Sequence, residues 1–150
     1  MKVVIQRVTE ASVTIDGVVR GQIAGGYMIL AGFVDSDTDE DMKWIAQKIV
    51  GLRVFNDADG VMNLSINDVS GDILLISQFT LHAMTKKGNR PSYIMAAKPD
   101  IAKPMYDKFI TVLESALGKK IQTGEFGADM KVSLLNDGPV TIIIDSKNRI

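Results

Sequence analysis

The segment Val13-Thr14-Ile15-Asp16-Gly17-Val18-Val19-Arg20-Gly21-Gln22-Ile23 decides the fold class of this chain. Two runs rich in β-branched residues flank the dipeptide Asp16-Gly17. This dipeptide predicts a two-residue hairpin turn, because both central residues of that turn need positive φ. The chain is therefore expected to contain antiparallel strands over residues 13–15 and 18–23.

Further strands are expected on both sides of this hairpin. Residues 3–8 alternate loosely and are rich in β-branched residues, which predicts a first strand. Residues 27–34 are mostly apolar and follow Gly25-Gly26, which is typical of a central strand buried on both faces. Later strands are expected at residues 52–55, 61–66, 73–81, 132–135 and 140–144, with hairpin turns at 56–60 and 136–139.

Two stretches with apolar residues at helical spacing predict helices, one after residue 38 and one over residues 101–117. The expected helix ends are Thr38 (with Asp41 three residues on) and Gly51, then Asp100 and Gly118, with Pro104 in the first turn. Many strands and two helices without strict alternation predict an α+β fold with a mainly antiparallel sheet or open barrel. A chain of 150 residues is expected to form a single domain over residues 1–150.

Composition excludes several classes of site. The chain has no cysteine, which excludes disulfides, zinc ribbons, iron–sulfur clusters and thiol nucleophiles. One histidine is too few for a transition-metal centre. The acidic run from Asp35 does not fit an EF-hand, since Glu40 and Ala46 stand where that loop needs Gly and Glu. We therefore expect no metal and no cofactor.

Charge and hydropathy indicate the cellular compartment in which this protein is expected. The net charge is -1, and the apolar stretches are far shorter than the roughly 18 residues that a membrane span needs. The amino terminus turns polar too soon for a secretory signal. The expected protein is cytoplasmic and does not enter membranes.

Three segments carry polar or unusual groups, and each has two interpretations. Ser77-Gln78-Phe79-Thr80 follows a buried run, so it forms either a site at a sheet edge or a strand that simply reaches solvent. Gly138-Pro139 is either part of a hairpin turn or, with a cis bond, a rigid fork of two carbonyl acceptors. The basic loop with Lys86, Lys87 and Arg90 is either solvated or a phosphate site.

For His82, Phe126 and Met130, the sequence favours a structural role over a functional one. His82 lies close in sequence to Ser77 and Thr80, but nothing identifiable would orient its imidazole as a triad requires. On an extended segment, alternation would also place Ser77 on the face opposite Thr80. Phe126 and Met130 are expected in the core rather than in a pocket lining.

Five motifs in a fixed order give the chain a resemblance to the D-aminoacyl-tRNA deacylase family. They are Met62-Asn63-Leu64, Ser77-Gln78-Phe79-Thr80-Leu81, Lys87-Gly88-Asn89-Arg90-Pro91-Ser92, Thr123-Gly124-Glu125-Phe126-Gly127-Ala128-Asp129-Met130 and Asn136-Asp137-Gly138-Pro139-Val140-Thr141. The openings Ile5-Gln6-Arg7-Val8 and Ala11-Ser12-Val13 add to the match. Only the tail at 145–150 and residues 82–86 fall outside it.

The resemblance implies a homodimeric, metal-free hydrolase of the cytoplasm that acts at the 3′-terminal adenosine of aminoacyl-tRNA. The bond cleaved would join a D-amino acid, or glycine, to the terminal ribose. Ser77, Gln78, Phe79 and Thr80 would form one wall of the pocket. Gly138 and Pro139 of the partner subunit, joined by a cis bond, would form the other wall. Arg7 would steady this loop across the interface, and Lys86, Lys87 and Arg90 would contact phosphates.

Two mechanisms are compatible with this pocket. Because an aminoacyl ester is already activated, main-chain N–H groups of Phe79 and Thr80 can stabilise the oxyanion while the substrate 2′-OH helps to activate water. Alternatively, the Thr80 hydroxyl acts as a covalent nucleophile. The carbonyl groups of Gly138 and Pro139 would hold the α-ammonium group and exclude an L side chain.

Three rival functions remain at this point. An editing deacylase would remove an L-amino acid from tRNA, and a non-catalytic tRNA-binding dimer would release nothing. A small-molecule esterase would cleave D-amino acid esters without RNA.

Overall fold

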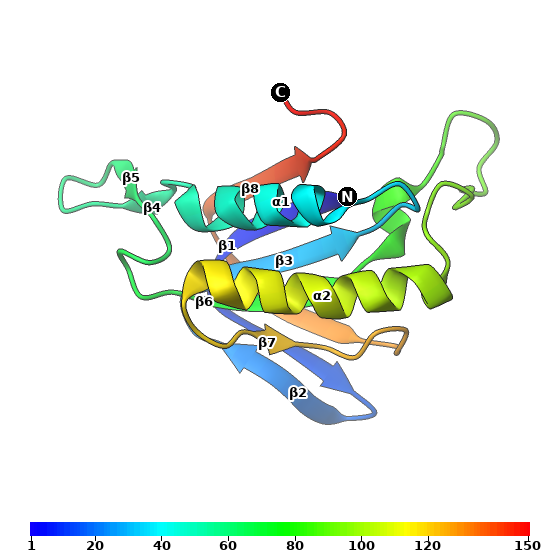
Figure 1. Ribbon diagram of the computed structural model, residues 1–150. Coiled ribbons are helices and arrows are strands. Elements are labelled where there is room, and N and C mark those ends of the chain that lie inside the picture. The colour runs from blue at the N-terminus through cyan, green and yellow to red at the C-terminus, as the bar shows by residue number, and fades with distance from the viewer.

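The computed structural model describes residues 1–150 and shows one curved sheet with two helices on one side (Figure 1). The helices are α1 (Asp39–Gly51) and α2 (Pro99–Leu117), and a short 3-10 helix η1 spans Phe79–His82. The strands are β1 (Lys2–Ile15), β2 (Val18–Ile23), β3 (Gly26–Gly32), β4 (Phe55–Asn56), β5 (Met62–Leu64), β6 (Asp72–Ser77), β7 (Gln122–Thr123) and β8 (Lys131–Asp145).

Strand β1 organises the sheet because it pairs with three other strands. It forms antiparallel ladders with β2, β3 and β8. The hairpin to β2 is confirmed, since Asp16 and Gly17 have φ values of 50° and 76° and Ile15 pairs with Val18. The two expected runs at residues 3–8 and 13–15 prove to be one continuous strand.

The sheet curls into a nearly closed barrel. Its strand order is β2-β1-β3-β6-β7, with β8 on the other edge of β1, and only β3–β6 and β6–β7 are parallel. The outer strands meet again at Gly21 of β2, where an added Cβ would lie 2.9 Å from the Thr123 carbonyl oxygen of β7. The α+β class with a mainly antiparallel, barrel-like sheet is therefore confirmed.

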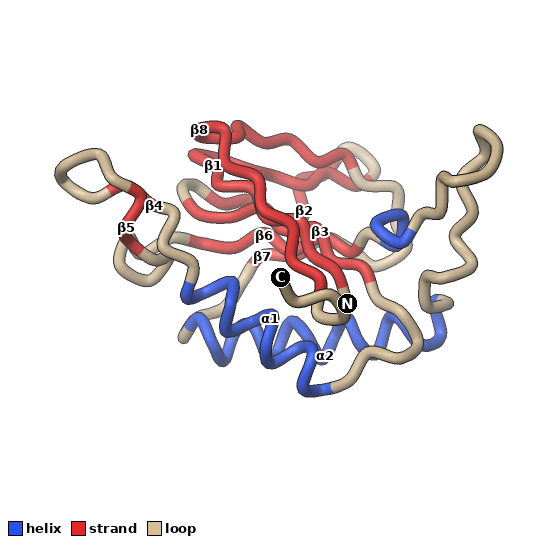
Figure 2. The backbone as a smooth tube through the Cα atoms, turned by 90° about the horizontal axis from the view of Figure 1, so that it is seen from above, coloured by secondary structure: helices blue, strands red, loops and turns tan.

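Two hydrophobic clusters stabilise this arrangement. The smaller one fills the barrel and includes Val13, Met28 and Leu74. The larger one lies between the sheet and the helices and includes Tyr27 and Phe109. Figure 2 shows both helices on the same side of the sheet, with the β4–β5 hairpin and the loop before α2 projecting at opposite ends. No helix has both the length and the apolar content to cross a bilayer.

The helix ends agree only in part with the sequence expectations. Thr38 caps α1 in a capping box with Asp41, and Gly118 ends α2 in the left-handed conformation, as expected. Gly51 was expected just beyond α1, but it is the last helical residue, because the chain leaves in an extended conformation at Leu52.

The start of α2 also differs from the expectation. Lys98, and not Asp100, is the N-cap, because Pro99 takes the first helical position, where its missing N–H costs nothing. Pro104 consequently lies in the second turn instead of the first.

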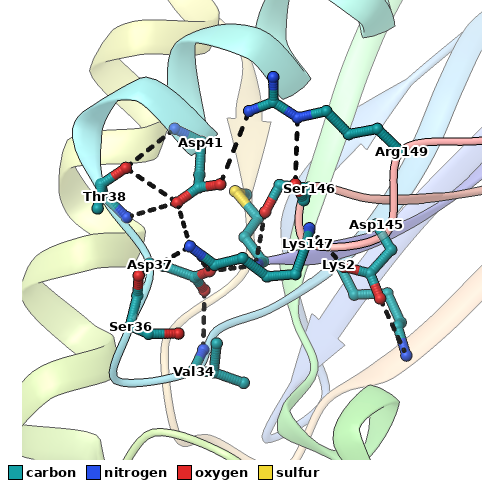
Figure 3. A network of polar contacts seen from close by, with 11 residues as sticks. Lys2, Val34, Ser36, Asp37, Thr38, Asp41, Asp145, Ser146, Lys147 and Arg149 are labelled. Carbon is teal, nitrogen blue, oxygen red and sulfur yellow. Dashed lines mark hydrogen bonds and ion pairs between the residues drawn. The ribbon is translucent and has the colours of Figure 1, made fainter.

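A polar network ties the carboxyl-terminal residues to α1 (Figure 3). The Asp41 carboxylate accepts hydrogen bonds from Thr38 N–H at 2.8 Å and from Lys147 Nζ at 2.7 Å. The Met1 amino group pairs with the buried Asp37 carboxylate and donates to Ser146 Oγ. Burial acts to raise the pKa of Asp41, but hydrogen bonds from Lys147 and Thr38 outweigh it and hold the pKa well below its usual range.

We expect Asp41→Asn to lower the free energy of unfolding by about 2 kcal/mol at pH 7, through loss of the capping box and the Lys147 ion pair. A carboxylate with a lowered folded-state pKa stabilises the fold above its unfolded pKa of about 3.9, and that stabilisation is lost as the pH falls below this value. The difference from wild type should therefore be constant down to about pH 4 and narrow below it. Urea unfolding between pH 7 and 3 measures this, with exposed Asp35→Asn as control, and a difference independent of pH would contradict the assignment.

Candidate functional site

A cavity of about 530 Å³ lies where β3 and β6 end and α2 begins. Its lining is mostly apolar and combines the end of β6 with the segments at 93–99 and 126–132. Ser77, Gln78 and Phe79 line the cavity, whereas Thr80, the next residue in the chain, is not part of its lining. The structure thus places Ser77, Gln78 and Phe79 at a pocket, and their role as a site stays a prediction.

The polar segment turns at this pocket instead of continuing as a strand. Strand β6 ends at Ser77, opposite Ala31, and the Gln78 N–H still donates to the Ala31 carbonyl at 2.7 Å. Residues 79–82 then form η1, so the expected strand to residue 81 is wrong. The physical reason is that β3 ends at Gly32, which leaves no partner strand beyond this point.

This turn leaves main-chain donors free at its start. Phe79 and Thr80 are the first residues of η1, so their N–H groups have no partner within that helix. The Gln78 side chain donates to Thr80 Oγ1 at 2.6 Å, which fixes the hydroxyl group. The exposed Phe79 ring packs edge-on against Tyr93, with ring centroids 5.1 Å apart, beside the pocket.

Phe126 and Met130 differ from their expected role. Both are half-buried and both line the pocket, although Phe126 also packs on Tyr106 with ring centroids 5.8 Å apart. They belong to the irregular segment after β7, where no strand or helix periodicity indicates which way a side chain points. Both also pack against the hydrophobic clusters, so the expected core contacts are confirmed and only the exclusion from the pocket lining is wrong.

The pocket has few charged groups. Lys98 and Asp129 are the charged residues of its lining, and the exposed Asp129 pairs with Lys131 at 2.9 Å. His82 does not line the pocket, and its buried Nε2 has no hydrogen-bond partner. No group of three or more acidic, histidine or cysteine side chains is placed to hold a metal ion. The pocket thus offers main-chain and amide groups to a ligand rather than a carboxylate pair.

The segment at 136–139 is a bulge within a strand and not a hairpin turn. Strand β8 runs without interruption from Lys131 to Asp145 along β1. Gln6 pairs with Thr141 and Val8 with Asn136, so Arg7 alone faces the four residues 137–140. The expected hairpin is wrong, because β1 continues as a partner on both sides of the bulge. The Gly138–Pro139 peptide bond is cis, as expected, and both residues are exposed.

The Arg7 side chain is hydrogen-bonded to this bulge. Its buried guanidinium donates from Nε to the Asp137 carbonyl at 3.0 Å and from Nη1 to the Val54 carbonyl at 2.5 Å. Asn56 Oδ1 lies 3.4 Å from the same Nη1. Arg7 therefore connects the bulge to the β4–β5 hairpin of its own chain, whereas the resemblance implied a contact across an interface.

Within one chain the two candidate walls do not meet. Ser77 pairs with Ala31, Ala31 with Val3, and Arg7 lies four residues further along β1. Gly138, opposite Arg7, is thus three strands and four residues away from Ser77, roughly 20 Å along the sheet. Neither Gly138 nor Pro139 lines the pocket. A second copy of the chain would be needed to bring the walls together.

The basic loop lies in the chain between η1 and Tyr93, and both Phe79 of η1 and Tyr93 line the pocket. Lys86, Lys87 and Arg90 are exposed and form no ion pair. Two hydrogen bonds between Met84 and Ser92, at 2.8 and 3.0 Å, close the base of the loop. The loop therefore presents three unpaired cations.

Sequence reasoning missed several residues of this region. Tyr93 and Lys98 reach the pocket from the irregular segment before α2, and no local pattern marks them. Asn136 was quoted only as part of a motif, although its side chain bonds to Arg7 O and Val140 O. An asparagine at this position was a usable signal, since a half-buried amide beside a bulge can replace the hydrogen bonds that the two strands lack there.

Known proteins match this chain over nearly its whole length. The family described as D-Tyr-tRNA(Tyr) deacylase matches residues 4–145. Proteins named D-aminoacyl-tRNA deacylase from Flavobacterium psychrophilum and Phocaeicola vulgatus are each 63% identical over 149 residues, covering 99% of both chains.

Solved structures agree with the fold. One described as c-Myc DNA Unwinding Element Binding Protein has a TM-score of 0.92 at 39% identity, covering 97% of this chain and 98% of its own. A probable eukaryotic D-amino acid tRNA deacylase has a TM-score of 0.82 at 18% identity, covering 95% and 97%, and shares the fold.

Proposed function

The chain belongs to the D-Tyr-tRNA(Tyr) deacylase family, and we propose that it hydrolyses the ester joining a D-amino acid, or glycine, to the 3′-terminal ribose of tRNA. The observation that carries this proposal is the pocket at the end of β6, whose lining includes Phe79 at the start of η1 and no histidine. Such a pocket suits an ester that is activated before it binds. The reaction needs no metal or cofactor and takes place in the cytoplasm, where tRNA is charged.

The catalytic contribution of the chain is electrostatic. The N–H groups of Phe79 and Thr80 stabilise the oxyanion that forms when water attacks the ester carbonyl, a contribution worth about 3 kcal/mol per donor. The substrate supplies the rest, since its α-ammonium group withdraws electrons and its 2′-OH orients or activates the water. Gln78 holds the Thr80 hydroxyl in place, and Ser77 contributes to the wall that faces the substrate.

The chain acts as a homodimer in which each subunit completes the pocket of the other. Gly138 and Pro139 lie on the exposed bulge of β8, far from Ser77 of the same chain. Exposed apolar side chains occur beside both walls, with Ile94 81% exposed near the pocket and Ile143 67% exposed on β8. Exposed apolar side chains of this size favour a surface that is covered by a partner, which supports reciprocal docking.

Chirality is read by exclusion. The carbonyl groups of Gly138 and Pro139 hold the α-ammonium group and occupy the space that an L side chain needs. A D side chain points away from this wall, and glycine fits because it carries a hydrogen on either side. Steric rejection of this kind predicts little discrimination among D side chains.

Deacylation of matched D-, L- and glycyl-tRNA tests the proposal. We expect hydrolysis of D- and glycyl-tRNA and no hydrolysis of L-aminoacyl-tRNA above the spontaneous rate. Turnover of L-seryl-tRNA would instead indicate an editing deacylase, and tRNA binding without release a non-catalytic module. Equal turnover of free D-amino acid esters, without RNA, would indicate a small-molecule esterase.

The basic loop provides the phosphate contacts to the tRNA, together with recognition of its terminal adenosine. We expect the triple substitution Lys86→Ala, Lys87→Ala, Arg90→Ala to raise KM for D-aminoacyl-tRNA about tenfold and to reduce its salt dependence, while kcat changes little.

A charge-matched control is the triple Ala substitution of Arg20, Lys43 and Lys48, which are exposed and form no ion pair. This control should keep KM within about twofold. Equal effects of the two triple variants would show that only net charge matters, and would exclude the loop as a specific contact.

A further inference from the structure

We propose that Asn136 is a positioning residue that clamps the bulge carrying Gly138 and Pro139. This inference rests on the proposed function, since it concerns the wall that selects chirality. The need for such a clamp follows from the ladder between β1 and β8. Because Arg7 alone faces residues 137–140, the regular hydrogen bonds between the strands stop at this bulge.

The side chain of Asn136 replaces the missing bonds. Its Nδ2 donates to the Arg7 carbonyl oxygen at 3.1 Å and to the Val140 carbonyl oxygen at 3.0 Å. Arg7 lies across from the bulge and Val140 lies at its far end. One amide group thus ties the start of the bulge both to its end and to the neighbouring strand.

The amide is itself held in one orientation. Thr141 Oγ1 lies 3.5 Å from Asn136 Oδ1 and accepts from Gln6 Nε2 at 3.3 Å. The acceptor end of the amide thus faces a hydroxyl group, and the donor end faces two carbonyl oxygens. Asn136 is half-buried, which limits competition by water for these bonds.

The clamp and Arg7 act on different parts of the bulge. Arg7 Nε bonds to the Asp137 carbonyl, directly before Gly138, whereas Asn136 closes the loop at Val140. With Arg7 alone, the chain from Gly138 to Val140 would be held only at Asp137 and by the ladder that resumes at Thr141, and the Val140 carbonyl would lose its bond to the start of the bulge. Asn136 therefore sets the position of the two carbonyl groups that the proposed function assigns to the α-ammonium group.

Two variants of the full chain test this role. Asn136→Ala removes both donors, and Asn136→Asp keeps the shape but turns a carboxylate oxygen toward two carbonyl oxygens. We expect amide hydrogen exchange at the three N–H groups of the bulge (residues 137, 138 and 140, since Pro139 has none) to become about tenfold faster in Asn136→Ala, and faster still in Asn136→Asp. The kcat/KM for D-aminoacyl-tRNA should fall about tenfold in the first variant and further in the second, and hydrolysis of L-aminoacyl-tRNA should rise above the spontaneous rate in both.

Ser133→Ala is the matched control, since Ser133 is an exposed residue of the same strand whose side chain makes no hydrogen bond. It should leave exchange and selectivity as in wild type. Exchange at 137–140 that stays within twofold of wild type in both Asn136 variants would overturn the clamp. So would faster exchange with an unchanged D/L ratio. If wild type does not hydrolyse D-aminoacyl-tRNA, the proposed function fails, and hydrogen exchange alone decides whether Asn136 holds the bulge.

Discussion

The Gly138→Ala variant is expected to hydrolyse D-aminoacyl-tRNA about 100-fold more slowly than wild type, because a small displacement of a positioned group costs about this much in rate. Gly138 has a φ of 128°, a conformation that L side chains rarely adopt. An added Cβ would lie 2.9 Å from Val140 Cγ2 and 3.0 Å from Arg7 Nη2. The bulge must therefore move, and with it the carbonyl groups that face the substrate.

Pro139→Ala should impair the same wall without adding bulk beside Arg7. Both variants should also hydrolyse L-aminoacyl-tRNA above the spontaneous rate, because the excluding surface has shifted. Single-turnover deacylation of D- and L-substrates measures both effects, and thermal unfolding checks that the fold is intact. Unchanged D-activity and unchanged D/L preference in both variants would reject the chiral wall.

Mixing experiments decide whether the wall comes from a second copy. A mixture of Gly138→Ala chains with Phe79→Pro chains, which lack the proposed N–H donor, contains heterodimers. In these, one pocket combines an intact Phe79 with an intact Gly138 from the other subunit. Activity should therefore exceed that of either variant alone after unfolding and refolding together. No gain on mixing would place both walls within one chain or discard the dimer.

Local signals predicted the parts of the fold that depend on few neighbours. The Asp16-Gly17 turn and the Thr38 cap are set by residues within a few positions, and both were predicted. The ends of β6 and the continuity of β8 depend on where β3 stops and where β1 continues. These are contacts between distant segments, and the local composition of residues 73–81 or 136–139 does not contain them.

The same distinction explains the site. The change from apolar to polar residues at Ser77, where β6 ends, is visible in the sequence. One wall of the pocket was therefore located from the sequence. Arg7 was placed beside Gly138 only through family resemblance. Its partners Val54 and Asp137 lie 47 and 130 positions away in sequence. The position of Phe126 in the pocket lining was missed because an irregular segment has no periodicity that indicates where a side chain points.

Thr80→Ala is expected to retain activity within about tenfold of wild type, whereas a tRNA ending in 2′-deoxyadenosine should react at least 100-fold more slowly. The Thr80 hydroxyl accepts a hydrogen bond from Gln78 at 2.6 Å, and no hydrogen bond from this hydroxyl to a base is present that would activate it as a nucleophile. The pocket lining also holds no histidine and no carboxylate beside Thr80 that could take its proton. The N–H of residue 80, in contrast, survives any side-chain substitution.

Single-turnover rates on ribose and deoxyribose substrates measure both effects, with Thr80→Val as a control that keeps the branched shape. If the hydroxyl were the nucleophile, Thr80→Ala and Thr80→Val would both lose nearly all turnover with an intact fold, and the 2′-deoxy substrate would still be cleaved by wild type. Removal of a nucleophile that acts with its partners costs about 10⁶-fold in kcat, far beyond the loss of one hydrogen bond. The two mechanisms thus differ by several orders of magnitude in the same pair of assays, because one places the attacking oxygen on the protein and the other on a water molecule that the RNA 2′-OH orients or activates.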